Sequence, residues 1–298
     1  MSTFYPAENP ASVLQYVPDV NIQSFVGEDG PGMITHEIAA RSENALIRTI
    51  FRDSEQRVSG ALYYNQLSNE QIKSIGQAAE RQPGEEFALV FQPETQAQIE
   101  RVRQFGAKSE ITYEAVRRNS IDEMSRLVDF LTLTIMRKLD SYVMDILTKA
   151  VNAKLTATAT APALSTAVSR DTPLSTLSLG HIIDAVAAGA ENDLAVDYDT
   201  LILRPTQASQ LKIQEKITGI SLAEDYGVNV VTSREFASNM GFLVDTDRAG
   251  EVYWEDPLTS EVIDDMSRHV YTVQSWATPA AAITTPHAIN MIGFEEGA

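Results

Sequence analysis

Apolar residues recur every three or four positions between residues 120 and 152, and this spacing predicts one unbroken α-helix. Ser120 and Glu123 form a capping-box pattern that marks its start, and no Pro or Gly interrupts it. The positions expected to be buried are Ile121, Met124, Leu127, Val128, Leu131, Ile135, Leu139, Val143, Ile146, Leu147 and Ala150. Such a helix is roughly 50 Å long, so we expect an extended, plate-like subunit.

The opposite side of this helix carries a polar stripe that includes Asp129, Arg137 and Asp140. We expect this stripe to face either solvent or a loop of a neighbouring subunit. Arg126 and Lys138 add further charge, which argues against a membrane-spanning helix.

Residues 1–43 carry frequent Pro and Gly, which predicts an irregular N-terminal arm. Short apolar groups lie between these residues, and they are too small to form a core of their own. We therefore expect the arm to pack over the rest of the chain or over a neighbouring copy.

Residues 44–94 are expected to form a projecting extended β-loop. Residues 45–51, 58–64 and 87–92 are strand-like, and residues 68–79 have the pattern of a short helix. An excursion with so few strands is marginal by itself, so we expect it to rest on another subunit. Its candidate contact residues are Tyr63, Tyr64, Glu80, Arg81, Glu85 and Glu86.

Basic residues gather between residues 95 and 118, where Thr112 is also expected to cap a short helix over residues 113–118. One interpretation is a surface that meets an acidic neighbour or nucleic acid. The other is a solvated face balanced by Glu100, Glu110 and Glu114. The basic residues are Arg101, Arg103, Lys108, Arg117 and Arg118, and all except Lys108 are candidate inter-subunit contacts.

The second half of the chain has a different pattern. Residues 155–169 are a low-complexity Ala/Thr stretch and are expected to be a connector. Residues 172–265 alternate between helical and strand-like segments, and residues 270–276 and 281–292 are extended segments expected to return to the long helix. The helices are expected from Ser178 and Thr206, and the strands at residues 199–203, 227–232, 241–244 and 251–254.

Charge and composition exclude several classes of function. The chain of 298 residues has a net charge of −18, which argues against binding DNA by neutralising its phosphates, and it contains no cysteine. We find no signal peptide, no apolar run of membrane-spanning length, no phosphate-binding glycine loop and no nucleophile motif. Asp245 and Asp247 could bind a cation, although a local Asx-turn is the better interpretation. We therefore expect no catalytic residues, no metal and no cofactor.

The order of these parts resembles a tailed-phage major capsid protein of the Hong Kong 97 type. The segments that carry the resemblance are residues 106–118 leading into the long helix, 199–206 (DTLILRPT), 227–232, 241–245 (GFLVD) and 285–289 (TPHAI). The resemblance covers residues 40–292 and implies an α+β, HK97-like fold. It assigns an N-terminal arm to residues 1–43, an extended β-loop to 44–94, a peripheral domain to 95–171 and 266–298 with a spine helix at 120–152, and an axial domain to 172–265.

The resemblance also implies a structural, non-enzymatic protein. Such subunits assemble as hexamers and pentamers in the host cytoplasm into an icosahedral virion capsid around double-stranded DNA. Some relatives carry a cleaved scaffolding segment before the arm, and none is evident here, which implies either a separate scaffolding protein or a chain given after processing; the Met1 start favours the separate protein. The other expected partners are a portal and a candidate decoration protein. Lys73 is the only lysine in the β-loop and shows no sign of activation, so covalent cross-linking is not expected.

Two alternatives stay open. One is an encapsulin-type nanocompartment shell protein, which would require an amphipathic N-terminal helix as a cargo dock, and the Pro- and Gly-rich arm argues against it. The other is a soluble α/β enzyme using His181, Asp245 or Asp247, which leaves the arm and the β-loop unexplained.

Overall fold

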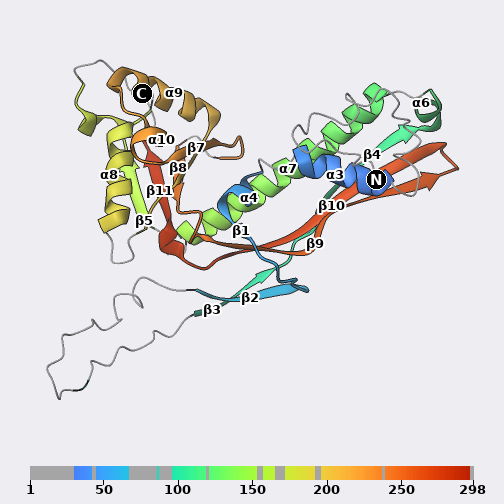
Figure 1. Ribbon diagram of the computed structural model, residues 1–298, viewed down its shortest axis with the longest axis horizontal. Helices are drawn as coiled ribbons and strands as arrows, with labels where there is room; N and C mark the ends of the chain where they lie inside the picture. Colours follow the sequence, from blue (N-terminus) through green and yellow to red (C-terminus); the bar gives the residue numbers. More distant parts are fainter. Residues whose placement is uncertain are drawn as a thin grey trace.

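The computed structural model describes residues 30–41, 45–66, 86, 96–118, 121–152, 157–164, 172–191, 196–236 and 239–295. It is an elongated mixed structure in which two bodies follow one another along the long axis (Figure 1). One body is a long sheet covered by α7. The other is a smaller sheet packed with α8 and α9.

The long helix α7 spans Ile121–Asn152 without interruption, as predicted. Every position from Met124 to Ala150 that was expected to be buried is buried. The capping residue Ser120 and the side chain of Ile121 lie outside what the structure describes. Tyr142 and Thr132 join them on the same side. Asp122 and Glu123 lie in the first turn and Lys149 lies in the last, which suits the helix dipole.

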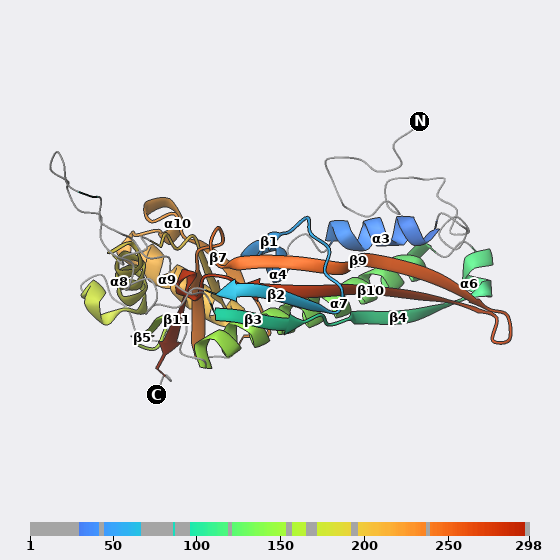
Figure 2. The same ribbon diagram turned by 90° about the horizontal axis from the view of Figure 1, so that it is seen from below.

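The helix lies on a four-stranded sheet in the order β1-β9-β10-β4. Its strands are β1 (Arg52–Asp53), β9 (Gly250–Asp265), β10 (Val270–Ile283) and β4 (Phe105–Thr112). β9 and β10 form a long antiparallel hairpin, and β4 continues into α6 (Tyr113–Arg117) at the far end (Figure 2). Thr112 caps α6 by accepting the N–H of Ala115 at 3.3 Å, as predicted. The predicted return of residues 270–276 to the long helix is confirmed. The strand predicted at residues 251–254 is the start of β9, so the expected boundary at residue 265 falls at the end of a hairpin strand.

Two N-terminal predictions are wrong. Gly30–Arg41 forms a helix, α3, where an irregular arm was expected. Pro31 lies in its first turn, where the missing N–H costs nothing, and Ile34 and Ile38 are fully buried one turn apart against α7.

The second wrong prediction concerns residues 45–51. Leu46–Ile50 is a short helix, α4, instead of a strand. Leu46, Ile47 and Ile50 are all buried, which is the spacing of one helix side facing the core.

The base of the predicted β-loop is a two-stranded antiparallel ladder, β2 (Ala61–Gln66) with β3 (Gln96–Arg101). This confirms most of the strand predicted at residues 58–64. The predicted helix at residues 68–79 and the strand at 87–92 lie outside the described residues.

The second body contains a five-stranded sheet in the order β5-β11-β8-β6-β7. Its strands are β5 (Ala157–Ala161), β11 (Ile289–Phe294), β8 (Met240–Val244), β6 (Thr200–Leu203) and β7 (Asn229–Thr232). Its helices are α8 (Ser178–Glu191), α9 (Pro205–Thr218) and α10 (Leu222–Asp225), with short 3-10 turns η1 (Leu174–Thr176) and η2 (Pro286–Ala288). The elements predicted between residues 178 and 244 are therefore confirmed. The Ala/Thr connector contains an edge strand, because β5 alternates Ala with β-branched Thr and pairs in parallel with β11.

One buried cluster joins the two bodies. It contains Ile135 and Leu147 of α7, Ile283 of β10, and Ile202 and Phe242 of the second sheet. The C-terminal half of α7 therefore shares its core with both sheets, which fixes their relative position.

Candidate inter-subunit surfaces

The β2–β3 ladder has one packed face and one open face. On the packed face, Leu62 is buried against Ala280 and Ala282 of β10. On the open face, Tyr63 and Ile99 are cross-strand partners and are 73% and 60% exposed. Arg101 is exposed and pairs with Ala61 on the same side. The open face therefore combines a large apolar contact area with a cation, in a ladder of only two strands.

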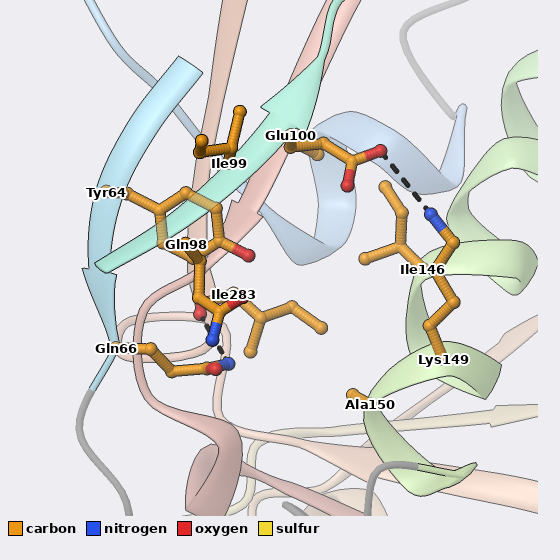
Figure 3. Close-up of a pocket in the computed structure, with 10 residues that line it drawn as sticks. Tyr64, Gln66, Gln98, Ile99, Glu100, Ile146, Lys149, Ala150 and Ile283 are labelled. Atoms are coloured by element: carbon orange, nitrogen blue, oxygen red, sulfur yellow. Dashed lines mark hydrogen bonds and ion pairs between the residues drawn. The ribbon is translucent and has the colours of Figure 1, made fainter. Parts of the chain in front are cut away.

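A pocket of about 230 Å³ lies between the packed face of this ladder and the end of α7 (Figure 3). Lys149 Nζ is 3.5 Å from Glu100 Oε1 across it, and Gln66 donates to the carbonyl of Ile283 at 3.1 Å. Tyr64 lies in the pocket, where burial, and then the charge of Glu100, raises its pKa. Tyr64 therefore faces its own subunit, whereas its neighbour Tyr63 faces outward.

Arg103 is held within its own subunit. Its guanidinium lies 5.5 Å from the ring centre of Tyr142 and 3.9 Å from Asp145. Tyr142 is buried, its hydroxyl oxygen accepts the N–H of Ala281 at 3.2 Å, and burial raises its pKa to about 12. Arg103 thus covers the tyrosine that joins α7 to β10.

The basic residues do not form one cluster. Arg117 and Arg118 are exposed beside α6, at the other end of β4 from Arg101 and Arg103 (Figure 1). The eight residues of β4 separate the two pairs by roughly 25 Å, because a strand rises about 3.3 Å per residue. Glu110, expected to balance the cluster, instead binds Arg268 through both oxygens at 2.7 and 2.8 Å, which lowers the pKa of Glu110.

The acidic candidates are mostly beyond the described residues. Glu86 is described and exposed. Glu80, Arg81 and Glu85 lie outside the described residues.

Asp140 does not belong to a solvent-facing stripe. It is half-buried, and its carboxylate accepts the N–H of Leu46 at 3.2 Å and the hydroxyl of Ser233 at 3.5 Å. The expectation of solvent or a neighbouring loop at Asp140 is therefore wrong. Asp129 and Arg137 are exposed, as expected of a stripe on the surface.

Two exposed apolar residues on α7 were not among the predicted contact residues. Phe130 and Leu133 are 63% and 56% exposed on the side away from the sheet. Their spacing relative to the buried stripe was the available signal, because both positions fall half a turn away from it.

Asp245 and Asp247 form the expected Asx-turn. The N–H of Asp247 donates to Asp245 Oδ1 at 3.1 Å, and the nearby Asp199 carboxylate accepts the N–H of Thr246 at 3.2 Å. Across the described part of the chain, no group of His, Asp or Glu is arranged to hold a metal ion. None of the described helices is long and apolar enough to cross a membrane.

The described residues thus combine an elongated fold with an exposed apolar face on the β2–β3 ladder. The phage capsid protein family model matches residues 95–289, about two thirds of the chain, and the chain therefore belongs to that family. No curated protein matches the chain.

Solved structures share the fold at low sequence identity. A structure from Mycobacterium phage Bobi is 14% identical over 85% of this chain and 91% of that one, with a TM-score of 0.60. One from Gordonia phage Cozz is 11% identical over 85% and 87%, with a TM-score of 0.59. A virus-like particle from Pyrococcus furiosus is 8% identical over 87% and 96%, with a TM-score of 0.59. Together with the family match, these likenesses confirm the α+β fold of the Hong Kong 97 type.

Proposed function

We propose that this phage capsid protein is the major shell subunit of a tailed phage. Its copies assemble as hexamers and pentamers into an icosahedral shell that encloses double-stranded DNA. The membership of the chain in the capsid family gives it a structural role and supports this proposal.

The observation that carries the proposal is the open face of the β2–β3 ladder. A two-stranded ladder is marginal unless it has a partner surface, and Leu62 supplies packing on one side only. Tyr63 and Ile99 on the other side are positioned to rest on an adjacent subunit. A contact between two different patches closes into a ring when it is repeated by rotation, which suits hexamers and pentamers.

The parts of the subunit have separate proposed roles. The body built on α7 and the long sheet is the peripheral domain, and the five-stranded sheet with α8 and α9 is the axial domain near the symmetry axes. The β2–β3 ladder is the base of the extended loop, and the arm is limited to the residues before α3, because α3 packs against α7. The candidate partners are a scaffolding protein, a portal and a decoration protein.

The proposed shell encloses DNA without binding its phosphates. The chain carries 41 acidic and 23 basic residues, so its net charge repels phosphates. The basic residues also lie in two separate pairs, Arg101 with Arg103 and Arg117 with Arg118. This separation favours local contacts with protein over a continuous DNA-binding face.

An encapsulin-type shell is the second candidate, because the virus-like particle from Pyrococcus furiosus shares the fold. Residues 30–41 form the helix α3, so Pro and Gly do not interrupt this part of the N-terminal region. However, Ile34 and Ile38 of α3 are buried in their own subunit and present no apolar face to a cargo.

Expression of the chain alone and with its scaffolding protein tests the proposal. Negative-stain microscopy is expected to show closed particles tens of nanometres across. Stable monomers or dimers under every scaffold and salt condition would contradict the shell proposal. Nuclease-resistant DNA in particles from infected cells supports a phage shell, whereas an enclosed enzyme supports the nanocompartment.

A further inference from the structure

An exposed strip along the outer side of α7 has an apolar centre and charged ends. Phe130 and Leu133 are 63% and 56% exposed near the middle of the 32-residue helix. Glu123 lies seven residues before Phe130 and Arg137 lies seven after it, and both are exposed. Seven residues make almost two turns, so these three residues lie on one side of the helix at intervals of roughly 10 Å. The α7 strip (Glu123, Phe130, Leu133 and Arg137) is therefore acidic at one end and basic at the other.

Contacts within the subunit mark the limits of this strip. α3 packs with the buried residues in the N-terminal half of α7 and so lies beside the strip. Farther along the helix, Asp140 is held against α4 through the N–H of Leu46. Neither Glu123 nor Arg137 forms an ion pair with another described residue. The charges at both ends of the strip are therefore available to a partner.

The strip is complementary to itself when two copies run in opposite directions. If a second α7 is laid antiparallel on the first with Phe130 on Phe130, Glu123 of each copy faces Arg137 of the other. Asp122 and Lys138 are exposed eight residues before and after Phe130, and they repeat this pattern on the flanks of the strip. Each acidic residue thus faces a basic one, while the apolar centres meet and bury each other.

Other occupants fit the strip less well. Two copies set parallel place Arg137 on Arg137 and Glu123 on Glu123, so like charges repel each other at both ends. A partner that carries charge of one sign matches one end of the strip and is repelled by the other. In the antiparallel pair, exposed Arg126 faces the uncharged Thr134. Charge complementarity therefore favours a second copy of this chain in the antiparallel arrangement.

We propose that two copies of this chain pair through the α7 strip, with their long helices antiparallel and Phe130 on the two-fold axis. The contact is isologous, because the same surface of each copy takes part. It differs from the proposed contact of the β2–β3 ladder, which joins two different surfaces into a ring. In the proposed shell, the α7 contact joins subunits of neighbouring rings, and only this placement rests on the proposed function.

Thiol cross-linking tests the contact directly, because the chain contains no cysteine. A residue on a two-fold axis meets its own copy, so a short thiol–thiol cross-linker should link Phe130→Cys subunits to each other. We expect a dimer band in denaturing gels, with a yield at least roughly tenfold above that of Ile213→Cys. Ile213 is the matched control, because it is 56% exposed but lies on α9. A mixture of Arg126→Cys and Thr134→Cys proteins, which both keep Phe130, should give the corresponding mixed dimer.

Charge reversal distinguishes this register from any other association. In the Phe130→Cys protein, Arg137→Glu sets a second carboxylate opposite Glu123 and should lower the cross-linking yield by roughly tenfold or more. Glu123→Arg/Arg137→Glu reverses both ends together, so each acidic residue again faces a basic one and the yield should recover. That recovery would also show that the reversed variant is folded.

The measurements are made at subunit concentrations below and above assembly. Links between Phe130→Cys subunits that are no more frequent than in Ile213→Cys at either concentration exclude the two-fold contact. Equal losses in Arg137→Glu and in the double reversal exclude the ion pairs, and links only to a different protein assign the strip to that partner.

Particle formation is scored separately from pairing. Intact particles without linked dimers overturn the pairing and leave the shell proposal standing. Linked dimers without particles under any condition support the pairing and contradict the shell proposal.

Discussion

Asp140 accepts the backbone N–H of Leu46 at 3.2 Å, and this bond joins the middle of α7 to the first turn of α4 across 94 residues of sequence. The first N–H groups of a helix have no partner within the helix, and Ala45 at the N-cap position supplies no side-chain acceptor. Asp140 therefore acts as a distant cap. Burial of its carboxylate raises the pKa of Asp140.

Replacement of Asp140 should separate its role as an acceptor from its charge. Asp140→Ala leaves the Leu46 N–H unpaired and should lower the free energy of unfolding by about 1–2 kcal/mol. Asp140→Asn keeps an acceptor oxygen and removes the buried charge, so its stability should lie within about 0.5 kcal/mol of wild type or above it. Urea denaturation at neutral pH measures both, with exposed Lys138→Ala as the control. Equal losses for Ala and Asn would contradict the capping role.

The sequence predicts α7 well and α3 and α4 badly, for a physical reason. The apolar spacing of α7 runs through 32 residues, so no other structure satisfies it. α4 has only five residues, and the acceptor for its Leu46 N–H is Asp140, which lies far away in sequence. α3 begins with Gly-Pro-Gly, a local turn signal that the burial of Ile34 and Ile38 overrides.

The open face of the β2–β3 ladder could also be predicted only in part, because it depends on contacts between residues far apart in sequence. Strand alternation predicts that Tyr63 and Tyr64 face opposite sides, but the side that packs is decided by β10. Ile99 was absent from the candidates because its pairing with Tyr63 joins residues on either side of a long insertion.

Tyr142→Phe should destabilise the junction between α7 and β10. The phenol oxygen accepts the buried N–H of Ala281 at 3.2 Å, and Phe cannot replace that acceptor. We expect a loss of about 1–2 kcal/mol in the free energy of unfolding. Tyr253→Phe, at a half-buried tyrosine that donates to the Glu251 carboxylate, is the comparison and should lose less. A neutral Tyr142→Phe variant in urea denaturation would argue against this bond as a structural link.

Asp245 should make stability depend on pH. The pKa of this buried carboxyl is raised above its ordinary value of 3.8, first by burial, with the charge of Asp199 adding to the effect. The folded state therefore holds the proton more tightly than the unfolded state. The resulting stabilisation is fully present below pH 3.8 and is lost as pH rises through the raised pKa.

Asp245→Asn removes this dependence and keeps an acceptor for the N–H of Asp247. The free energy of unfolding of the variant relative to wild type should therefore be higher at pH 7 than at pH 4. Urea denaturation of both proteins at each pH measures the difference. A relative stability that increases on acidification would reverse the sign and exclude this account.

Gly250 should not tolerate a side chain. A Cβ at this position would overlap the carbonyl oxygen of Ala282, which is backbone of the paired strand β10. Gly250→Ala must displace one strand of the hairpin and should cost about 2–3 kcal/mol or prevent folding. Gly293→Ala in β11 is the matched control, because its Cβ would meet nothing closer than 3.9 Å. Thermal unfolding that ranks the two variants equally would contradict the packing argument.

Tyr63 and Ile99 should affect assembly without affecting the stability of the subunit. Both side chains are exposed on the open face of the β2–β3 ladder, so Tyr63→Ser/Ile99→Ser should change the free energy of unfolding by less than about 0.5 kcal/mol. In a shell, the same change removes two large apolar side chains from each contact, a loss of about 2–3 kcal/mol or more per contact. Light scattering and negative-stain microscopy should therefore show a higher critical concentration for particle formation, or no particles.

Two control variants accompany this prediction. Leu62→Ala tests the packed face of the ladder, because loss of this buried side chain should lower the free energy of unfolding of the subunit by about 2–3 kcal/mol. Ile213→Ser controls for the loss of an exposed apolar residue elsewhere. Normal particles from the Tyr63→Ser/Ile99→Ser variant at wild-type concentrations would show that the open face is not a subunit contact.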